Sequence, residues 1–234
     1  MLQRIDYADG DASLTGWFAA PAGDRPVPGV LVAHEAPGVG PHVKAVAERL
    51  TGSGYAALAL DLYGGEGFAL EAAQALHRQM METPGLMVRR ARAGLAALQA
   101  QPQVDGARLA GIGFCQGGIT VLELARDGAP LRAAIGFHPG LKRPAGSREG
   151  PIAAKVLMMV GDADPVVPAA DRLAFARDMD AAGADWQLHL YGGVGHSFTN
   201  PAVDAMGYPG FAYEARAARR AWTTMLGLLA ELFQ

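Results

Sequence analysis

The sequence is poor in cysteine and in long apolar runs, and its charges nearly balance. Its one cysteine, Cys115, cannot form a disulfide within the chain, and a zinc site built from cysteines is not expected. The longest purely apolar runs, such as Ala56–Leu60 and Val156–Val160, are far too short to span a bilayer. The formal charge of −3, from 20 basic and 23 acidic residues, gives no electrostatic case for binding nucleic acid or an anionic membrane.

The N-terminus also lacks the apolar segment of a secretory signal, because Asp6, Asp9 and Gly10 interrupt the region where it would run. We therefore expect a soluble cytoplasmic protein. Its expected partner is a small-molecule substrate, with neither nucleic acid nor membrane involved.

Apolar residues make up 50% of the 234, which is enough for a packed core and excludes disorder. Short β-type runs alternate with longer helical ones, and this pattern favours an α/β fold with a mostly parallel sheet. No repeat or internal linker is present, so we expect a single domain over residues 1–234.

The expected elements follow from the spacing of apolar residues and from glycine and proline positions. Strands are predicted over 4–7, 14–20, 28–33, 55–60, 108–114, 133–137, 155–160 and 186–191, and helices over about 41–53, 70–81, 86–100, from 116, 169–182 and 213–233. The first two strands form a hairpin around Gly10. In the last strand, Trp186, Leu188 and Leu190 are expected on one face.

The most informative motif is Gly-Phe-Cys-Gln-Gly-Gly at 113–118, between a predicted strand and a predicted helix. A sharp turn there would strain its central residue and crowd its neighbours, which explains Gly113 and Gly117. The turn would lift Cys115 above the sheet edge and aim the amide of Gln116 at the same space. These are features of a nucleophile elbow with half an oxyanion hole, although a buried, inert cysteine is the alternative.

Two later loops supply candidates for an acid and a base. Asp164 lies in the loop Gly-Asp-Ala-Asp-Pro at 161–165, beyond a buried strand, and is favoured over Asp162, which is closer to that strand. A helix cap is the alternative use of such an aspartate. Among six histidines, His196 follows a strand on a glycine-rich loop after the acid, whereas His42 and His77 are expected to be solvated on helices.

The combination has more weight than its parts. Cys115, Asp164 and His196 each fall just beyond a predicted strand, where open α/β sheets bind their ligands. Their order along the chain, nucleophile, acid and histidine, is that of the α/β-hydrolases. We therefore predict a thiol that attacks an ester or lactone carbonyl and forms a thioester, which water cleaves with His196 as base.

At these motifs the chain resembles the dienelactone hydrolase family of the α/β-hydrolase superfamily. The similarity covers nearly the whole chain and includes the cysteine elbow at 113–118, the acid loop at 161–168, the histidine loop at 195–198 and the segment His-Glu-Ala-Pro-Gly at 34–38. The resemblance implies an α/β-hydrolase fold with about eight strands, no large lid domain, and no metal or organic cofactor.

The resemblance also implies roles for residues that spacing alone does not single out. Glu35 matches a glutamate that pairs with the thiol and helps to deprotonate it, and the backbone amides of Ala36 and Gln116 match the oxyanion hole. Dienelactone-specific members hold the substrate carboxylate with arginines, one of them four residues after the histidine, where this chain has Asn200. Arg78, Arg89 and Arg90 are candidate substitutes, and the departure points to a neutral or differently shaped ester, lactone or thioester.

Loop positions add four candidate pocket residues, Tyr63, Phe114, His138 and Phe198, to Arg78. Two other functional classes remain open. The same catalytic groups could transfer an acyl group to another acceptor or cleave a carbon–halogen bond. Alternatively, a non-catalytic α/β module could sense oxidants through Cys115.

Overall fold

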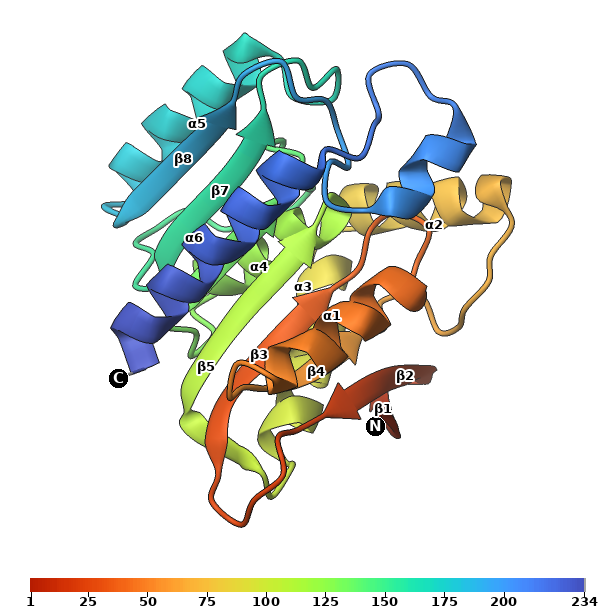
Figure 1. Ribbon diagram of the computed structural model, residues 1–234, viewed down its shortest axis with the longest axis vertical. Coiled ribbons are helices and arrows are strands. Elements are labelled where there is room, and N and C mark those ends of the chain that lie inside the picture. The colour runs from red at the N-terminus through yellow and green to blue at the C-terminus, as the bar shows by residue number, and fades with distance from the viewer. Residues whose placement is uncertain (234) are drawn as a thin grey trace.

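The computed structural model describes residues 1–233, in which an eight-stranded sheet is covered by helices on both faces (Figure 1). The sheet order is β1-β2-β4-β3-β5-β6-β7-β8. The strands are β1 (Gln3–Asp9), β2 (Ala12–Ala19), β3 (Val27–Ala33), β4 (Ala56–Leu60), β5 (Val104–Phe114), β6 (Ala133–Phe137), β7 (Lys155–Gly161) and β8 (Trp186–Tyr191). The predicted α/β class and strand number are confirmed.

The sheet is parallel from β4 to β8, and its antiparallel part is confined to the N-terminal edge. There β1 and β2 form the predicted hairpin, in which Gly10 adopts a φ of 58°, and β2 pairs antiparallel with β4. Because the six remaining strands run the same way, their carboxyl ends meet at one edge. That edge is where an open α/β sheet places its site.

Two hydrophobic cores separate the sheet from its helices. The helices are α1 (Pro41–Thr51), α2 (Leu70–Glu82), α3 (Leu86–Gln99), α4 (Gln116–Arg126), α5 (Ala169–Ala181) and α6 (Ala215–Phe233). Helices α1 and α6 cover one face, and α2 to α5 pack against the other. Alternate residues of β3 enter opposite cores, with Leu31 in one and Val32 in the other, as the two-residue period of a strand requires. In residues 1–233, no helix combines the length and the apolar character that crossing a membrane would need.

The structure departs from the sequence-based elements at several positions. Strand β5 begins at Val104 rather than at 108, because its first residues pair with Val27 and Pro28 of β3. A 3-10 helix, η1 (Pro201–Met206), was not predicted, and α6 begins at Ala215. Leu190, predicted on the same face of its strand as Trp186 and Leu188, is 51% exposed because β8 is the edge strand.

Candidate active site

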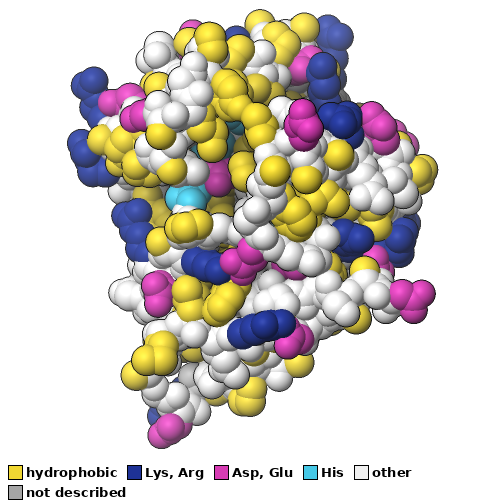
Figure 2. Space-filling view, turned by 90° about the vertical axis from the view of Figure 1, so that its right-hand side faces the viewer, with side chains coloured by type: hydrophobic (Ala, Val, Ile, Leu, Met, Phe, Trp, Pro, Cys, Tyr) yellow, Lys and Arg dark blue, Asp and Glu magenta, His cyan; other side chains and the backbone are white. Residues whose placement is uncertain are grey.

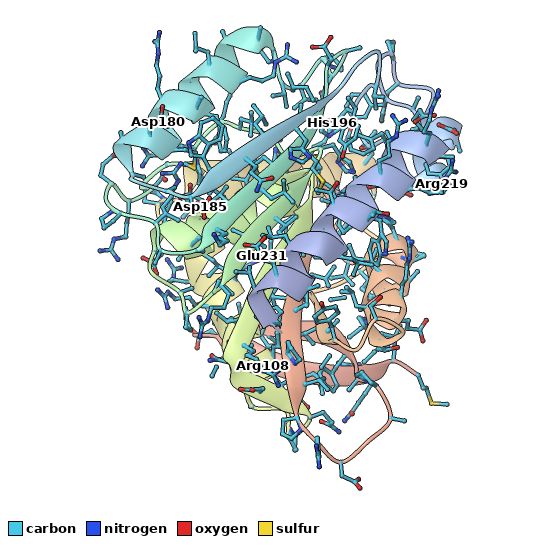
Figure 3. All side chains as sticks on the ribbon, turned by 60° about the vertical axis from the view of Figure 1, so that its left-hand side comes forward. Arg108, Asp180, Asp185, His196, Arg219 and Glu231 are labelled. Atoms are coloured by element: carbon cyan, nitrogen blue, oxygen red, sulfur yellow. The ribbon has the colours of Figure 1, made fainter. Side chains whose placement is uncertain are left out.

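Cys115, Asp164 and His196 come together at the carboxyl edge of the sheet, beyond β5, β7 and β8 respectively. Figure 3 shows His196 near the upper end of the sheet, whereas Arg108, early in β5, lies toward the opposite end. The parallel arrangement of the strands thus gathers side chains that are up to 81 residues apart in sequence, from 115 to 196.

Cys115 occupies a strained turn between β5 and α4. Its φ of 51° and ψ of −114° are unusual for a residue with a side chain, and they leave the thiol partly exposed. A Cβ on Gly113 would lie 2.0 Å from the carbonyl oxygen of Gly117, and a Cβ on Gly117 would lie 2.1 Å from that of Ala33. Both positions therefore require glycine, which is the reason that the elbow motif has this spacing.

His196 and Asp164 form a fully buried pair. The Nδ1 atom of His196 lies 2.7 Å from Oδ2 of Asp164, and the two side chains are 1% and 0% exposed. Burial disfavours the imidazolium, but the hydrogen bond to Asp164 and the adjacent Cys115 outweigh it and raise the pKa of His196 to about 10. These interactions favour the imidazolium form, and Nε2 of His196 has no other hydrogen-bond partner within residues 1–233.

Asp164, and not Asp162, is the partner of that histidine. Its other oxygen accepts a hydrogen bond of 2.8 Å from the backbone N–H of Val166, which fixes the carboxylate. Asp162 is 55% exposed and pairs instead with Arg172 on α5, at 2.9 Å.

Two backbone amides near the thiol are free to bind an anion. Gln116 is the first residue of α4, and within residues 1–233 neither its N–H nor that of Ala36 donates to a backbone carbonyl. The hydroxyl of Tyr63 lies 3.0 Å from the carbonyl oxygen of Ala36 and 2.8 Å from Oε1 of Gln116. Tyr63 thus bridges the two segments that present these amides.

Glu35 lies beside this site with its carboxylate already engaged. Asn200 donates to both oxygens, at 3.1 and 3.3 Å, and Nδ1 of His42 lies 3.2 Å from Oε1. A hydrogen bond to Cys115 is not among the contacts of Glu35 in the described part of the chain. Its pairing with the thiol stays a prediction.

A model of the dienelactone hydrolase family matches residues 14–233. The chain belongs to the dienelactone hydrolase family. The family relationship extends to a "Putative carboxymethylenebutenolidase" of Methylorubrum extorquens, 31% identical over 80% of this chain and 69% of the relative. A "Probable 2-oxo-3-(5-oxofuran-2-ylidene)propanoate lactonase" of Bradyrhizobium is 27% identical over 95% of this chain and 91% of the relative.

The solved structures agree with this family assignment. A dienelactone hydrolase-like promiscuous phosphotriesterase from metagenomic libraries superposes with a TM-score of 0.95 at 41% identity, covering 100% of this chain and 99% of the other. A structure from Klebsiella pneumoniae, at 23% identity over 99% of both chains and a TM-score of 0.78, shares the fold. As a member of the dienelactone hydrolase family, the chain is an ester or lactone hydrolase.

The candidate pocket residues of this family member differ in their surroundings. His138 and Phe198 are fully buried, and the ring of His138 lies 5.2 Å from that of His196. Burial, together with the nearby His196 and His42, keeps the pKa of His138 well below its usual range. His138 thus packs beside the His196 ring in surroundings that disfavour its charged form. Its φ of 40° adds a second strained position near Cys115.

The remaining candidates are divided between the core and the surface. Phe114 is buried and stacks on Phe137 at 4.8 Å beneath the elbow, and Tyr63 is nearly buried. Arg78 is exposed on α2, Arg89 pairs with Asp9 at 3.6 Å, and Arg90 donates to the carbonyl of Leu62.

The expectation that His42 and His77 are solvated is wrong. His42, near the start of α1, reaches Glu35, and His77 on α2 contacts Oε1 of Gln116. Helical spacing could not reveal these contacts, because the partner groups lie on other segments, Glu35 on the loop before α1 and Gln116 at the start of α4. Figure 2 shows a hollow on this face of the molecule in which histidine and acidic side chains reach the surface.

Proposed function

We propose that this protein hydrolyses a small carboxylic ester or lactone with Cys115 as nucleophile, His196 as proton carrier and Asp164 as the group that orients His196. The observation that supports this most is the strained elbow cysteine beside a buried His196–Asp164 pair, in which Nε2 of His196 has no other partner among residues 1–233. A histidine oriented through Nδ1 by a carboxylate is the arrangement that activates such nucleophiles.

The reaction begins with the proton of the thiol on His196, whose raised pKa favours the imidazolium. The thiolate attacks the carbonyl carbon, and the carbonyl electron pair moves to oxygen. When the tetrahedral intermediate collapses, the C–O bond breaks and the imidazolium gives its Nε2 proton to the leaving alkoxide. The products of this half are an acyl-thioester on Cys115 and a free alcohol, which remains attached to the acyl group when the substrate is a lactone.

Water completes the cycle. Neutral His196 takes a proton from water, the resulting hydroxide attacks the thioester, and the C–S bond breaks to release the carboxylic acid and the thiolate. In both halves the oxyanion is held by the N–H groups of Ala36 and Gln116. Such preorganised donors contribute about 2.7–4 kcal/mol each to transition-state stabilisation.

The substrate class follows from the charges around Glu35. Asn200, which stands at the position of a carboxylate-binding arginine, donates to Glu35 and supplies no positive charge. Arg78 is exposed on α2. We therefore propose a neutral ester or lactone in preference to an anionic one. The name of the Bradyrhizobium relative supports a lactone ring, although the substrate in that name is a propanoate and so carries a carboxylate.

The test compares p-nitrophenyl acetate hydrolysis by the wild type and by Cys115→Ala, with circular dichroism to verify folding. We expect nitrophenolate release by the wild type and its loss in the folded variant. Equal release by both proteins would make Cys115 a bystander and overturn the mechanism.

Phosphotriester hydrolysis is a second candidate, favoured by the 41% identity to the promiscuous phosphotriesterase over the whole chain. The same thiolate would attack phosphorus and expel p-nitrophenolate as the P–O bond breaks, with the two amides stabilising the phosphoryl oxygen. Water, deprotonated by His196, would then cleave the P–S bond to release the phosphodiester and the thiolate. A neutral p-nitrophenyl phosphotriester, assayed with the same two proteins, decides this point. Turnover that depends on Cys115 supports the second activity, and no turnover restricts the site to carbonyl substrates.

A further inference from the structure

We propose that His42 and Asn200 are positioning residues that hold the carboxylate of Glu35 and thereby fix the backbone N–H of Ala36 as an oxyanion donor. This inference rests on the proposed function, because it concerns the oxyanion hole of that reaction. It gives Glu35 a role different from the deprotonation of Cys115 that the family resemblance implies.

The carboxylate of Glu35 is held from two separate segments. Asn200 comes from the loop that follows His196, and its amide cannot turn freely, because its Oδ1 accepts a 3.0 Å hydrogen bond from the N–H of Ala202. Its Nδ2 therefore faces Glu35, at 3.1 and 3.3 Å from the two oxygens. His42 approaches from α1, with Nδ1 3.2 Å from Oε1. This is a contact at ion-pair distance without hydrogen-bond geometry, because Nδ1 is buried and has no hydrogen-bond partner within residues 1–233.

The ring of His42 is itself held in place. It packs edge-on against Phe114, with 4.6 Å between ring centroids and 67° between planes, and its side chain is 16% exposed. Phe114 is the residue immediately before Cys115. His42 therefore connects Glu35 to the elbow itself, and its orientation depends on packing rather than on solvent.

The peptide group between Glu35 and Ala36 connects the side chain that Asn200 and His42 hold to the N–H group that would bind the oxyanion. The carbonyl oxygen of Glu35 and the N–H of Ala36 belong to one planar unit and point in opposite directions. That carbonyl accepts from Nδ1 of His34, at 2.6 Å, and from the N–H of Gly38, at 3.0 Å. With the carbonyl anchored on one side and the Glu35 side chain on the other, the direction of the Ala36 N–H is fixed before substrate arrives.

Preorganisation of this kind has a measurable effect. An oxyanion donor helps catalysis because it needs no reorganisation during the reaction, and a displacement of about 1 Å can reduce the rate about 100-fold. Removing the anchor should therefore slow the formation of the acyl-enzyme. It should leave the reactivity of the thiol itself unchanged, since the His196–Asp164 pair does not contact Glu35.

The experiment measures two rates on the same variants. The first is the acylation burst with p-nitrophenyl acetate, which develops an oxyanion. The second is alkylation of Cys115 by iodoacetamide, which develops none. His42→Leu removes the polar ring and keeps the bulk of the side chain, whereas His42→Asn keeps a nitrogen at the place of Nδ1, because both nitrogens are two bonds from Cβ.

We expect His42→Leu to slow acylation roughly 10- to 100-fold with an unchanged alkylation rate, and His42→Asn to stay within a few-fold of wild type. His189→Leu, the same change at a histidine on β8 that contacts Gln187, is the matched control and should alter neither rate. Thermal unfolding of each variant verifies that it is folded. Asn200→Ala repeats the comparison from the other segment and should show the same split, including when His42→Leu does not fold.

Three results would overturn the proposal. A parallel loss of acylation and alkylation would place Glu35 and His42 in thiol activation instead. No change in either rate, or an equal loss in the Leu and Asn variants, would show that the nitrogen at the Nδ1 position does not matter. If iodoacetamide alkylates the wild type but p-nitrophenyl acetate never acylates it, the proposed hydrolase function itself is refuted. The wild type is measured first, so this outcome is distinguished from a failure of the positioning proposal.

Discussion

The site contains two pairs of histidine and carboxylate with opposite surroundings. In one, His196 and Asp164 are 2.7 Å apart and almost completely buried. In the other, His42 and Glu35 are 3.2 Å apart, their side chains are 16% and 13% exposed, and the carboxylate is shared with Asn200. One site thus contains the same two chemical groups twice, once as a buried pair, which we call the dry pair, and once as a partly exposed pair.

The difference teaches how burial determines what such a pair can do. In the dry pair, the carboxylate oxygens have few partners, and the histidine pKa is shifted far from its usual value. That pair is suited to holding and releasing a proton. In the partly exposed pair, the carboxylate accepts hydrogen bonds from Asn200 and has His42 at ion-pair distance, and these contacts from two different segments suit it to fixing the geometry of a loop.

The largest expected contrast is between Asp164→Asn and Glu35→Gln. Asp164→Asn should lower kcat/KM for p-nitrophenyl acetate by about 10³–10⁴-fold, because His196 loses both its orientation and the stabilisation of its charged form. Glu35→Gln keeps hydrogen-bonding capacity and should cost about tenfold, comparable to one hydrogen bond to a charged group. Steady-state kinetics of both variants measures the contrast, and equal losses would remove the distinction between the two pairs.

The second contrast concerns the proton on His196. Titration of the His196 ring by NMR should give a pKa of about 10 in the wild type and a clearly lower one in Asp164→Asn. Because the folded pKa exceeds the ordinary value of about 6.5, the stability that this pair contributes is fully present below about pH 6.5. It is lost as the pH rises toward 10.

Urea unfolding across that pH range measures the same effect. The unfolding free energy of the wild type should fall with rising pH more than that of Asp164→Asn. Parallel curves for the two proteins, or a His196 that titrates near its ordinary pKa, would contradict the assignment of the proton to His196.

A smaller effect is expected when charge is introduced beside Glu35. Asn200→Asp removes the donor and sets two carboxylates about 3 Å apart, and like charges at this separation repel. We expect acylation to fall further than in Asn200→Ala, by about tenfold relative to that variant, the equivalent of about 1.4 kcal/mol. Burst kinetics of the two variants, measured side by side, tests this order, and a faster Asp variant would reverse the account of Asn200.

The smallest effect is expected at the neighbouring carboxylate. Asp162 pairs with Arg172 at the surface, two residues before Asp164. Asp162→Asn should leave kcat and KM unchanged and shift stability by less than about 1 kcal/mol, as surface ion pairs usually do. A large loss of kcat in this variant would show that the acid had been assigned to the wrong residue.

The sequence predicted the buried pair of His196 and Asp164 but not the partly exposed pair of His42 and Glu35. The strands at 133–137 and 186–191 were predictable because short apolar runs have few alternatives, and the elbow because Gly113 and Gly117 have no room for a Cβ. His42 was not predictable as a contact of Glu35, since a polar residue on a helix usually faces solvent. Only the folded loops bring Asn200 and Glu35 together across 165 residues of sequence.

The irregular elements show the same limit. The first residues of β5 include Asp105 and Gly106, which break the apolar pattern, and only their pairing with β3 makes them a strand. The 3-10 helix at Pro201–Met206 begins with the Asn200 cap, a local signal that is too common in turns to predict a helix. In both segments the secondary structure depends on contacts with other parts of the chain, which the local sequence does not show.

The most direct test of the central claim, that Cys115 forms an acyl-thioester, is mass spectrometry of the acid-quenched reaction with p-nitrophenyl acetate. We predict that the intact wild-type protein gains the mass of one acetyl group during the burst, and that fragmentation places it on Cys115. The adduct should disappear as substrate is exhausted. Nitrophenolate release without any acetylated protein, or an acetyl group on another residue, would contradict the account.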